Sequence, residues 1–335
     1  MIGKKVMRAF VSSQLKNIKS SNLYSTCTAI SINKIETNAN PMTAFMLLNN
    51  NNANFKINQN KKQHQLSNKM SFSTHNPSSS PSGSEILASF NETKRSNFEG
   101  NDVDGAMYAL ANADAVCFDV DSTVIEEEGI DVLADSLGKG KEVADFTAKA
   151  MGGSMKFEEA LAARLELMKP SRSSVLDCLE SHPIRLSPGI DRLIKTLHLH
   201  GKDVYLVSGG FRMMIEPIAK ELMVSKTNIY ANTILFDEND GNTYKGFDAN
   251  EPTSADGGKP KALSIIKDKF GYDKMVMVGD GATDAQAKPP ADSFIGFGGV
   301  VVRDAVKDKA CWFVYDFEDM ISVVDNFGTQ RESTN

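Results

Sequence analysis

The sequence predicts an α/β protein built on a doubly wound parallel sheet. From residue 186 onward, short apolar segments alternate with segments of helical periodicity, as in a parallel sheet with helices on both faces. Before that alternation, four helical segments follow the first apolar strand without a strand between them. We therefore expect residues 110–128 and 186–327 to form a Rossmann-like sheet core, with residues 129–185 inserted as a small helical-bundle cap.

Charge is distributed unevenly along the chain. The first 84 residues contain ten Lys or Arg and one acidic residue, Glu36, a balance of +9, whereas the whole chain carries −6. The remaining residues are therefore strongly acidic, which argues against nucleic acid as a partner. No run of 18 apolar residues occurs, so the sequence predicts no membrane span.

Residues 1–100 are rich in Ser and Asn and lack apolar periodicity, so we expect a disordered extension. The first 35 residues contain six basic residues and no acidic one, which is typical of a transit peptide for a mitochondrion or plastid. The alternative is an asparagine-rich extension without a targeting role, in a cytoplasmic protein. The four scattered cysteines include no C-x-x-C pair, which indicates a reduced intracellular protein without a zinc site.

The remaining elements follow from periodicity. In the cap region, apolar residues recur at three- and four-residue spacing in helices expected at 126–136, 142–151, 156–168 and 173–181. Further helices are expected at 190–200, 213–222 and 259–270, and strands at 203–207, 274–278, 294–297 and 312–314. Residues 230–236 and 243–247 are expected to form a hairpin-like excursion from the sheet.

The first strand, residues 115–118, leads directly into Asp119 and Asp121. Side chains at i and i+2 of an extended chain point to the same side, so both carboxylates can converge where ligands bind, at the carboxyl end of the strand. Two close carboxylates raise each other's pKa unless a cation lies between them, which separates an ionised nucleophile or metal ligand from a proton carrier. The alternative for an isolated D-x-D is a solvated turn.

Two further clusters favour phosphate binding. Ser208-Gly209-Gly210 follows the strand at 203–207 and begins a helix, where free backbone N–H groups and close approach suit an anion. Lys259 begins another helix after two glycines and can neutralise a phosphate oxygen. Taken singly, these clusters are better explained by an ordinary strand-to-helix turn and a solvated lysine.

The fourth cluster contains acids again. The strand at 274–278 leads into G-D-G-A-T-D, which contains Asp280 and Asp284. Together with Asp119 they would supply the oxygen ligands that Mg²⁺ prefers. The D-x-D-x-D-G ladder of an EF-hand is missing. Four polar clusters in this order, each at a strand end or helix start, indicate a common site.

The order of the clusters and the residues within them resemble the haloacid-dehalogenase superfamily of phosphotransferases and, within it, the phosphoserine phosphatases. The resemblance covers about residues 113–324. The strings that carry it are F-D-V-D-S-T-V, E-E-G-I-D, A-M-G-G-S, V-S-G-G-F-R, G-G-K, G-D-G-A-T-D and F-I-G-F-G-G. It implies Mg²⁺-dependent hydrolysis of O-phospho-L-serine to L-serine, the last step of phosphorylated serine biosynthesis, through an aspartyl phosphate.

The resemblance also implies roles for individual residues. Asp119 would be the nucleophile, and Asp121 the acid that protonates the leaving serine and then the base that activates water. Mg²⁺ would be held by the side chains of Asp119 and Asp280 and the backbone carbonyl of Asp121. The phosphate would be held by Ser208, the amides of Gly209 and Gly210, and Lys259.

The same resemblance assigns the rest of the site. Glu128 would bind the substrate ammonium and Arg164 its carboxylate. Thr283 and Asp284 would support the metal and the lysine, with Thr283 at the substrate. Met151 and Gly152 would belong to a lid that excludes water. A homodimer is compatible with the sequence, which identifies no interface.

Three other functions compete with this hypothesis. A phosphotransferase would pass the phosphoryl group to another alcohol, or the phosphatase would act on another small amino-phosphate. A receiver-type signalling domain also phosphorylates an aspartate, but it lacks both an acid two residues later and a helical insert. A catalytically silent relative is disfavoured by the intact Asp119, Asp121, Lys259 and Asp280.

Overall fold

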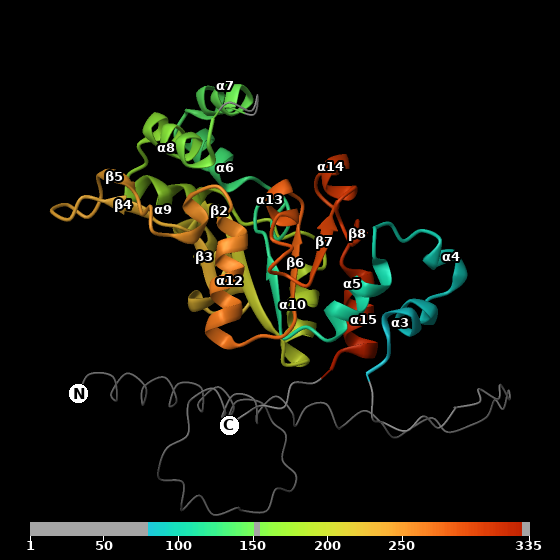
Figure 1. Cartoon of the computed structure of the whole chain (residues 1–335). Coiled ribbons are helices and arrows are strands. Elements are labelled where there is room, and N and C mark those ends of the chain that lie inside the picture. The colour runs from blue at the N-terminus through green and yellow to red at the C-terminus, as the bar shows by residue number, and fades with distance from the viewer. Residues whose placement is uncertain (1–79, 151–154, 330–335) are drawn as a thin grey trace, which may run out of the picture. The chain divides into compact units, whose positions relative to one another are not determined.

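A six-stranded sheet organises the part of the chain that the computed structural model describes, residues 80–150 and 155–329 (Figure 1). Its order is β3-β2-β1-β6-β7-β8, and every neighbouring pair is parallel. The strands are β1 (Ala115–Phe118), β2 (Asp203–Phe211), β3 (Ile229–Asn232), β6 (Met275–Gly279), β7 (Ser293–Phe297) and β8 (Trp312–Val314). The predicted doubly wound sheet is confirmed, and β1 lies at the point where the strand order reverses.

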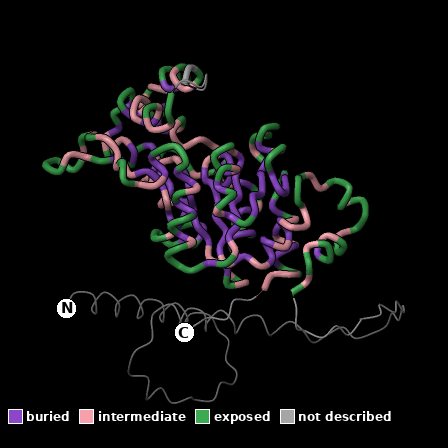
Figure 2. The backbone as a smooth tube through the Cα atoms, viewed as in Figure 1, coloured by how far each residue is buried: buried purple, intermediate pink, exposed green. Residues whose placement is uncertain are grey.

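Helices cover both faces of this sheet. One apolar cluster joins it to α5 (Val103–Ala111), α10 (Ile190–Leu199), α11 (Arg212–Glu221) and α15 (Glu318–Phe327), and a second cluster joins it to α12 (Gly258–Phe270). Successive residues of β1 alternate between these clusters, since Val116 and Phe118 belong to the first and Ala115 and Cys117 to the second. The central strands are consequently buried on both sides (Figure 2).

Before α10, four helices lie between β1 and β2, as the periodicity predicts. They are α6 (Gly129–Ser136), α7 (Gly140–Ala150), α8 (Phe157–Met168) and α9 (Arg172–Ser181). They share a third apolar cluster with Phe211 and Met214, at the carboxyl end of β2 and in α11. The hairpin of β4 (Ile234–Phe236) and β5 (Tyr244–Phe247) joins the same cluster and contacts α8. This packing holds the helices over the carboxyl end of the sheet.

The amino-terminal region differs from the expected disorder within the described residues. Helices α3 (Gly83–Ser89) and α4 (Glu92–Arg95) precede α5, where we expected an unstructured chain up to residue 100. A capping box of Ser82 and Glu85 begins α3, and its Ile86 is fully buried. Phe98 packs edge-on against Trp312 of β8, so long-range contacts stabilise these short helices. Residues 1–79, with the predicted transit peptide, lie outside the described part.

The hairpin prediction was partly wrong. Ile229–Asn232 forms β3, which pairs in parallel with β2, and only the segment from Ile234 joins β5. Periodicity alone could not separate the two, because both segments are short and apolar. The short elements η2 (Lys226–Asn228), η3 (Pro252–Ser254), α13 (Ala282–Ala285) and α14 (Asp304–Lys307) were not predicted.

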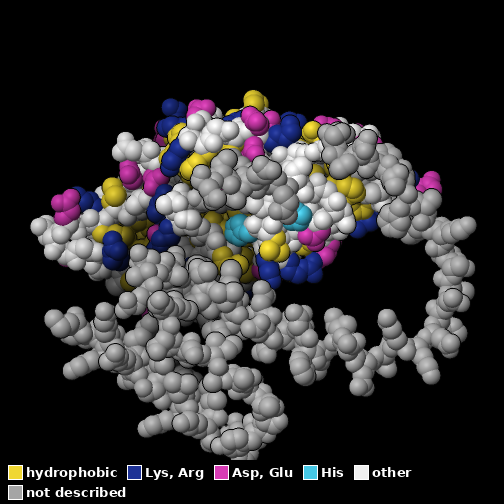
Figure 3. All heavy atoms as spheres, turned by 90° about the horizontal axis from the view of Figure 1, so that it is seen from below, with side chains coloured by type: hydrophobic (Ala, Val, Ile, Leu, Met, Phe, Trp, Pro, Cys, Tyr) yellow, Lys and Arg dark blue, Asp and Glu magenta, His cyan; other side chains and the backbone are white. Residues whose placement is uncertain are grey.

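The face of the molecule seen in Figure 3 is mixed in charge. Viewed from below, acidic, basic and hydrophobic side chains are interspersed where grey atoms do not cover them (Figure 3). Among the helices of the described residues, none has the length and hydropathy needed to cross a bilayer.

Candidate active site

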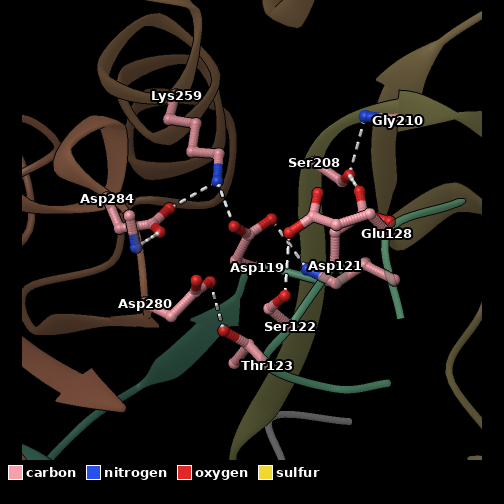
Figure 4. Close-up of polar contacts among 12 residues, drawn as sticks. Asp119, Asp121, Ser122, Thr123, Glu128, Ser208, Gly210, Lys259, Asp280 and Asp284 are labelled. Carbon is pink, nitrogen blue, oxygen red and sulfur yellow. Dashed lines mark hydrogen bonds and ion pairs between the residues drawn. The ribbon is translucent and has the colours of Figure 1, made fainter. Parts of the chain in front are cut away.

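Asp119 lies at the end of β1 and is 8% exposed. Its N–H donates to the carbonyl of Val278 (2.9 Å), which extends the β1–β6 ladder to the site. Its carboxylate oxygen Oδ1 accepts the N–H of Val120 (2.7 Å), and Oδ2 lies 2.7 Å from Nζ of Lys259 (Figure 4). The second oxygen therefore points into the space between β1 and the start of α12.

Asp121 lies beside it, held by two donors. Its Oδ1 accepts the N–H of Gly129 (2.6 Å), and its Oδ2 accepts the hydroxyl of Ser208 (3.2 Å). Burial, together with the charges of Asp119 and Glu128, raises the pKa of Asp121 to about 7. A carboxyl group with such a pKa can both give and take a proton near neutral pH.

Lys259 is buried between two carboxylates. Besides Asp119, its Nζ contacts Oδ1 of Asp284 (2.5 Å), a residue with no exposed surface. The second oxygen of Asp284 accepts the N–H of Gly281 (2.9 Å). Burial alone would lower the pKa of Lys259, but Asp119 and Asp284 outweigh burial and raise it. The lysine is therefore a fixed positive charge aimed at Asp119.

The acids at the ends of β1 and β6 form a group suited to a cation. Carboxylate oxygens of Asp119, Asp280 and Asp284 lie within 4.8 Å of one another, and all three residues are buried. Oδ1 of Asp280 accepts the hydroxyl of Thr123 (3.0 Å), and its other oxygen forms an ion pair with Arg303. Hard, anionic oxygen donors in this number fit Mg²⁺.

A cavity of about 440 Å³ opens over these residues. Predicted site residues that line it are Asp119, Asp121, Glu128, Arg164, Gly209, Gly210, Lys259, Asp280 and Thr283. Ser208 and Asp284 lie behind this lining, bonded to Asp121 and Lys259. Met151 and Gly152 lie outside the described residues. The structure thus gathers the predicted residues that it describes around one cavity.

Glu128, directly before the helical insert, and Arg164, within it, bring opposite charges to the cavity. The hydroxyl of Ser122 donates to Oε1 of Glu128 (2.8 Å), and burial raises the pKa of Glu128. Burial lowers the pKa of Arg164, whereas the charges of Asp131 and Glu128 raise it. A ligand with an ammonium and a carboxylate could pair with both side chains.

Sequence reasoning missed Arg303, which also lines the cavity. Its guanidinium forms an ion pair with Asp280, donates to the backbone carbonyl of the same residue (3.1 Å) and lies 3.8 Å from Glu128. Its position in the sequence could have identified it, because Arg303 comes shortly after the F-I-G-F-G-G string, in the loop after β7 that reaches the same edge of the sheet.

Known proteins resemble this chain in sequence and in fold. The sequence model of the haloacid dehalogenase-like hydrolases matches residues 113–289. The chloroplastic phosphoserine phosphatase of Arabidopsis thaliana is 54% identical over 64% of this chain and 72% of its own length. A phospho-aspartyl intermediate analogue of phosphoserine phosphatase matches 61% of this chain and 94% of its own, with 27% identity and a TM-score of 0.53.

A larger solved structure matches as well. DsGPDH of Dunaliella salina is similar over 65% of this chain, with 34% identity and a TM-score of 0.58. The match covers 37% of that protein, so this chain spans little more than a third of its length.

Proposed function

The chain belongs to the haloacid dehalogenase-like hydrolases and is a phosphatase, and from this premise we propose that it hydrolyses O-phospho-L-serine to L-serine and phosphate. One observation carries the proposal. The cavity that contains Asp119 and Lys259 also contains Glu128 and Arg164, which suit the charged groups of an amino acid. Relatives with the same activity in their names support this substrate.

The first step would transfer the phosphoryl group to Asp119. Its carboxylate oxygen attacks phosphorus, and the bond between phosphorus and the serine oxygen breaks. Asp121, with a pKa of about 7, gives its proton to the departing oxygen. The products of this step are L-serine and an aspartyl phosphate.

The second step would restore the enzyme. Asp121, now ionised, takes a proton from water while the water oxygen attacks phosphorus, and the bond to Asp119 breaks. Throughout both steps, Ser208, the amides of Gly209 and Gly210, and Lys259 hold the phosphate oxygens. Asp284 fixes Lys259 through their 2.5 Å contact.

Asp119, Asp280 and the backbone carbonyl of Asp121 would hold Mg²⁺, with Thr283 and Asp284 in supporting positions. When bound, Mg²⁺ would offset the negative charge of the transferred group. Arg303, which now pairs with Asp280, would have to share that carboxylate with the metal.

Substrate recognition would come from the insert and from the residue directly before it. Glu128 would accept the substrate ammonium and Arg164 would bind its carboxylate. We propose residues 129–185 as a cap domain that closes on the core, residues 110–128 and 186–327, with Met151 and Gly152 in its lid. Closure would remove water from Asp119 before transfer.

The wider context follows from the substrate. Release of L-serine would complete phosphorylated serine biosynthesis. The basic amino-terminal region and the chloroplastic relative favour a plastid over a mitochondrion or the cytoplasm.

Phosphate release from O-phospho-L-serine, with and without Mg²⁺, tests the proposal, with Asp119→Asn beside the wild type. Mg²⁺-dependent release that the variant loses, and that is poor with phosphothreonine or sugar phosphates, would support it. Release from many phosphates but not from phosphoserine would overturn the substrate. Transfer to added alcohols would instead indicate a phosphotransferase.

A further inference from the structure

Asn232, at the end of β3, is fully buried although its side chain is polar. Its amide nitrogen Nδ2 donates to the backbone carbonyl of Gly209 (2.8 Å), and its Oδ1 accepts the hydroxyl of Thr253 (3.1 Å). Thr253 is 2% exposed and lies in η3, shortly before Lys259 in the chain. A buried amide with both ends paired this way links two segments that line the cavity.

The side-chain hydrogen bond of Asn232 lies where the backbone pairing of β2 with β3 is interrupted. The β2–β3 ladder pairs Val207 with Tyr230 and resumes at Phe211 and Asn232, after a shift of register. Residues 208–210 lie in the gap. The side chain of Asn232 therefore bonds the carbonyl of Gly209, which the irregular ladder does not pair with β3.

The direction of that carbonyl decides the direction of the next N–H. In a trans peptide the C=O of Gly209 and the N–H of Gly210 point opposite ways. With the carbonyl held by Asn232, the N–H of Gly210 donates to Oγ of Ser208 (2.8 Å), on the side of Asp121 (Figure 4). Because both residues are glycines, little steric cost would oppose a flip that turns the oxygen toward the phosphate.

We propose that Asn232 is a positioning residue of the phosphate site, which locks the Gly209–Gly210 peptide with its N–H toward the bound anion. Thr253 orients the amide of Asn232 and so joins Gly209 and Gly210 of β2 to the segment that leads to Lys259. The inference rests on the proposed function, because it assumes that the backbone of these two glycines binds phosphate. The glycines provide the N–H groups for phosphate, and Asn232 explains why the N–H of Gly210 faces it.

The test measures binding of inorganic phosphate and of L-serine separately, by calorimetry in buffer with Mg²⁺. Asn232→Ala removes the donor without adding charge, and we expect phosphate to bind about 10-fold more weakly, as for a lost buried hydrogen bond. L-Serine affinity should stay within about 2-fold of the wild type. Thr253→Val should weaken phosphate binding in the same direction, and Thr253→Ser, which keeps the hydroxyl, should restore it.

Asn228 provides a matched control at the other end of β3. Its Nδ2 donates to the carbonyl of Val204, also on β2 (3.0 Å). Asn228→Ala should change stability without changing phosphate affinity. Unchanged phosphate affinity in Asn232→Ala, or equal losses for phosphate and L-serine, would overturn the positioning role. Phosphate binding is measured without turnover. Failure to hydrolyse phosphoserine would therefore refute the substrate proposal, and the phosphate affinities of Asn232→Ala and Asn228→Ala would still test the positioning role.

Discussion

The ammonium nitrogen Nζ of Lys259 lies 2.7 Å from the carboxylate oxygen Oδ2 of Asp119. The contact brings the start of α12 against the end of β1, and both side chains are almost completely buried. A charge pair in such a place costs desolvation, which its mutual attraction and further bonds must offset. Its position beside the carboxylate that we propose as the nucleophile suits phosphoryl transfer better than stability.

Lys259→Met should therefore affect both catalysis and the stability of the fold. We expect kcat/KM to fall roughly 10²- to 10³-fold, because a charge that stabilises the transferred group is lost. The free energy of unfolding should fall by about 3–5 kcal/mol, because two buried carboxylates lose their partner. Lys261→Met, at an exposed position of the same helix, should change neither kcat/KM nor the free energy of unfolding. Steady-state kinetics and urea unfolding measure the two quantities. Equal behaviour of the two variants would contradict the assigned role.

Asp121→Asn should separate the two steps of the reaction. With phosphoserine, turnover should fall roughly 10²- to 10⁴-fold, because the leaving oxygen is no longer protonated. With p-nitrophenyl phosphate, whose leaving group needs no proton, the first step should persist and a burst of about one p-nitrophenolate per enzyme should appear. Stopped-flow absorbance measures the burst, and Asp119→Asn should show none. The same loss with both substrates and no burst would argue against acid catalysis.

Arg164→Met should change substrate preference. The variant loses the partner of the substrate carboxylate, so kcat/KM for phosphoserine should fall about 10- to 100-fold. O-Phosphoethanolamine, which lacks that carboxylate, should be hydrolysed as by the wild type. Arg185→Met, which removes a surface pair with Glu127, serves as the control. A parallel loss with both substrates would show that Arg164 acts on something other than the carboxylate.

Mg²⁺ should stabilise the folded protein through Asp280. At about 100 times its Kd the metal would add about 2.7 kcal/mol to the free energy of unfolding, seen as a higher Tm. Asp280→Asn should abolish most of this shift, and Asp292→Asn, which breaks a surface pair with Lys267, should preserve it. A full Mg²⁺-dependent shift in Asp280→Asn would place the metal elsewhere.

Lys202 should make stability depend on pH. Its buried ammonium donates to the carbonyls of Ala111 (2.8 Å) and Ala113 (3.0 Å), and burial lowers its pKa from the ordinary 10.5 to about 8. Between these values the unfolded chain binds more protons, so this residue should make the free energy of unfolding rise with pH. The urea midpoints of the wild type and Lys202→Met at about pH 8 and pH 9.5 measure the difference. The same change of midpoint with pH in both proteins would refute the assignment of this pH dependence to Lys202.

The sequence was sufficient for most of the fold and for the acids, serine and lysine of the site. Asp119, Ser208 and Asp280 can be grouped from the sequence alone, because each follows a strand that periodicity identifies. The carboxyl ends of parallel strands meet at one edge of a sheet, so position along the chain implies proximity in space. Glu128 and Arg164 came from the family resemblance, since nothing local distinguishes them from ordinary helix charges.

Only the tertiary structure decided the contacts that depend on long-range packing. It paired Arg303 with Asp280, placed Asn232 against Gly209 and assigned Ile229–Asn232 to the sheet. It also showed Ile86 buried in a helix where composition predicted disorder. Local patterns determine which residues form strands and helices, but partners far apart in sequence are chosen by the packing of the whole sheet and its helices.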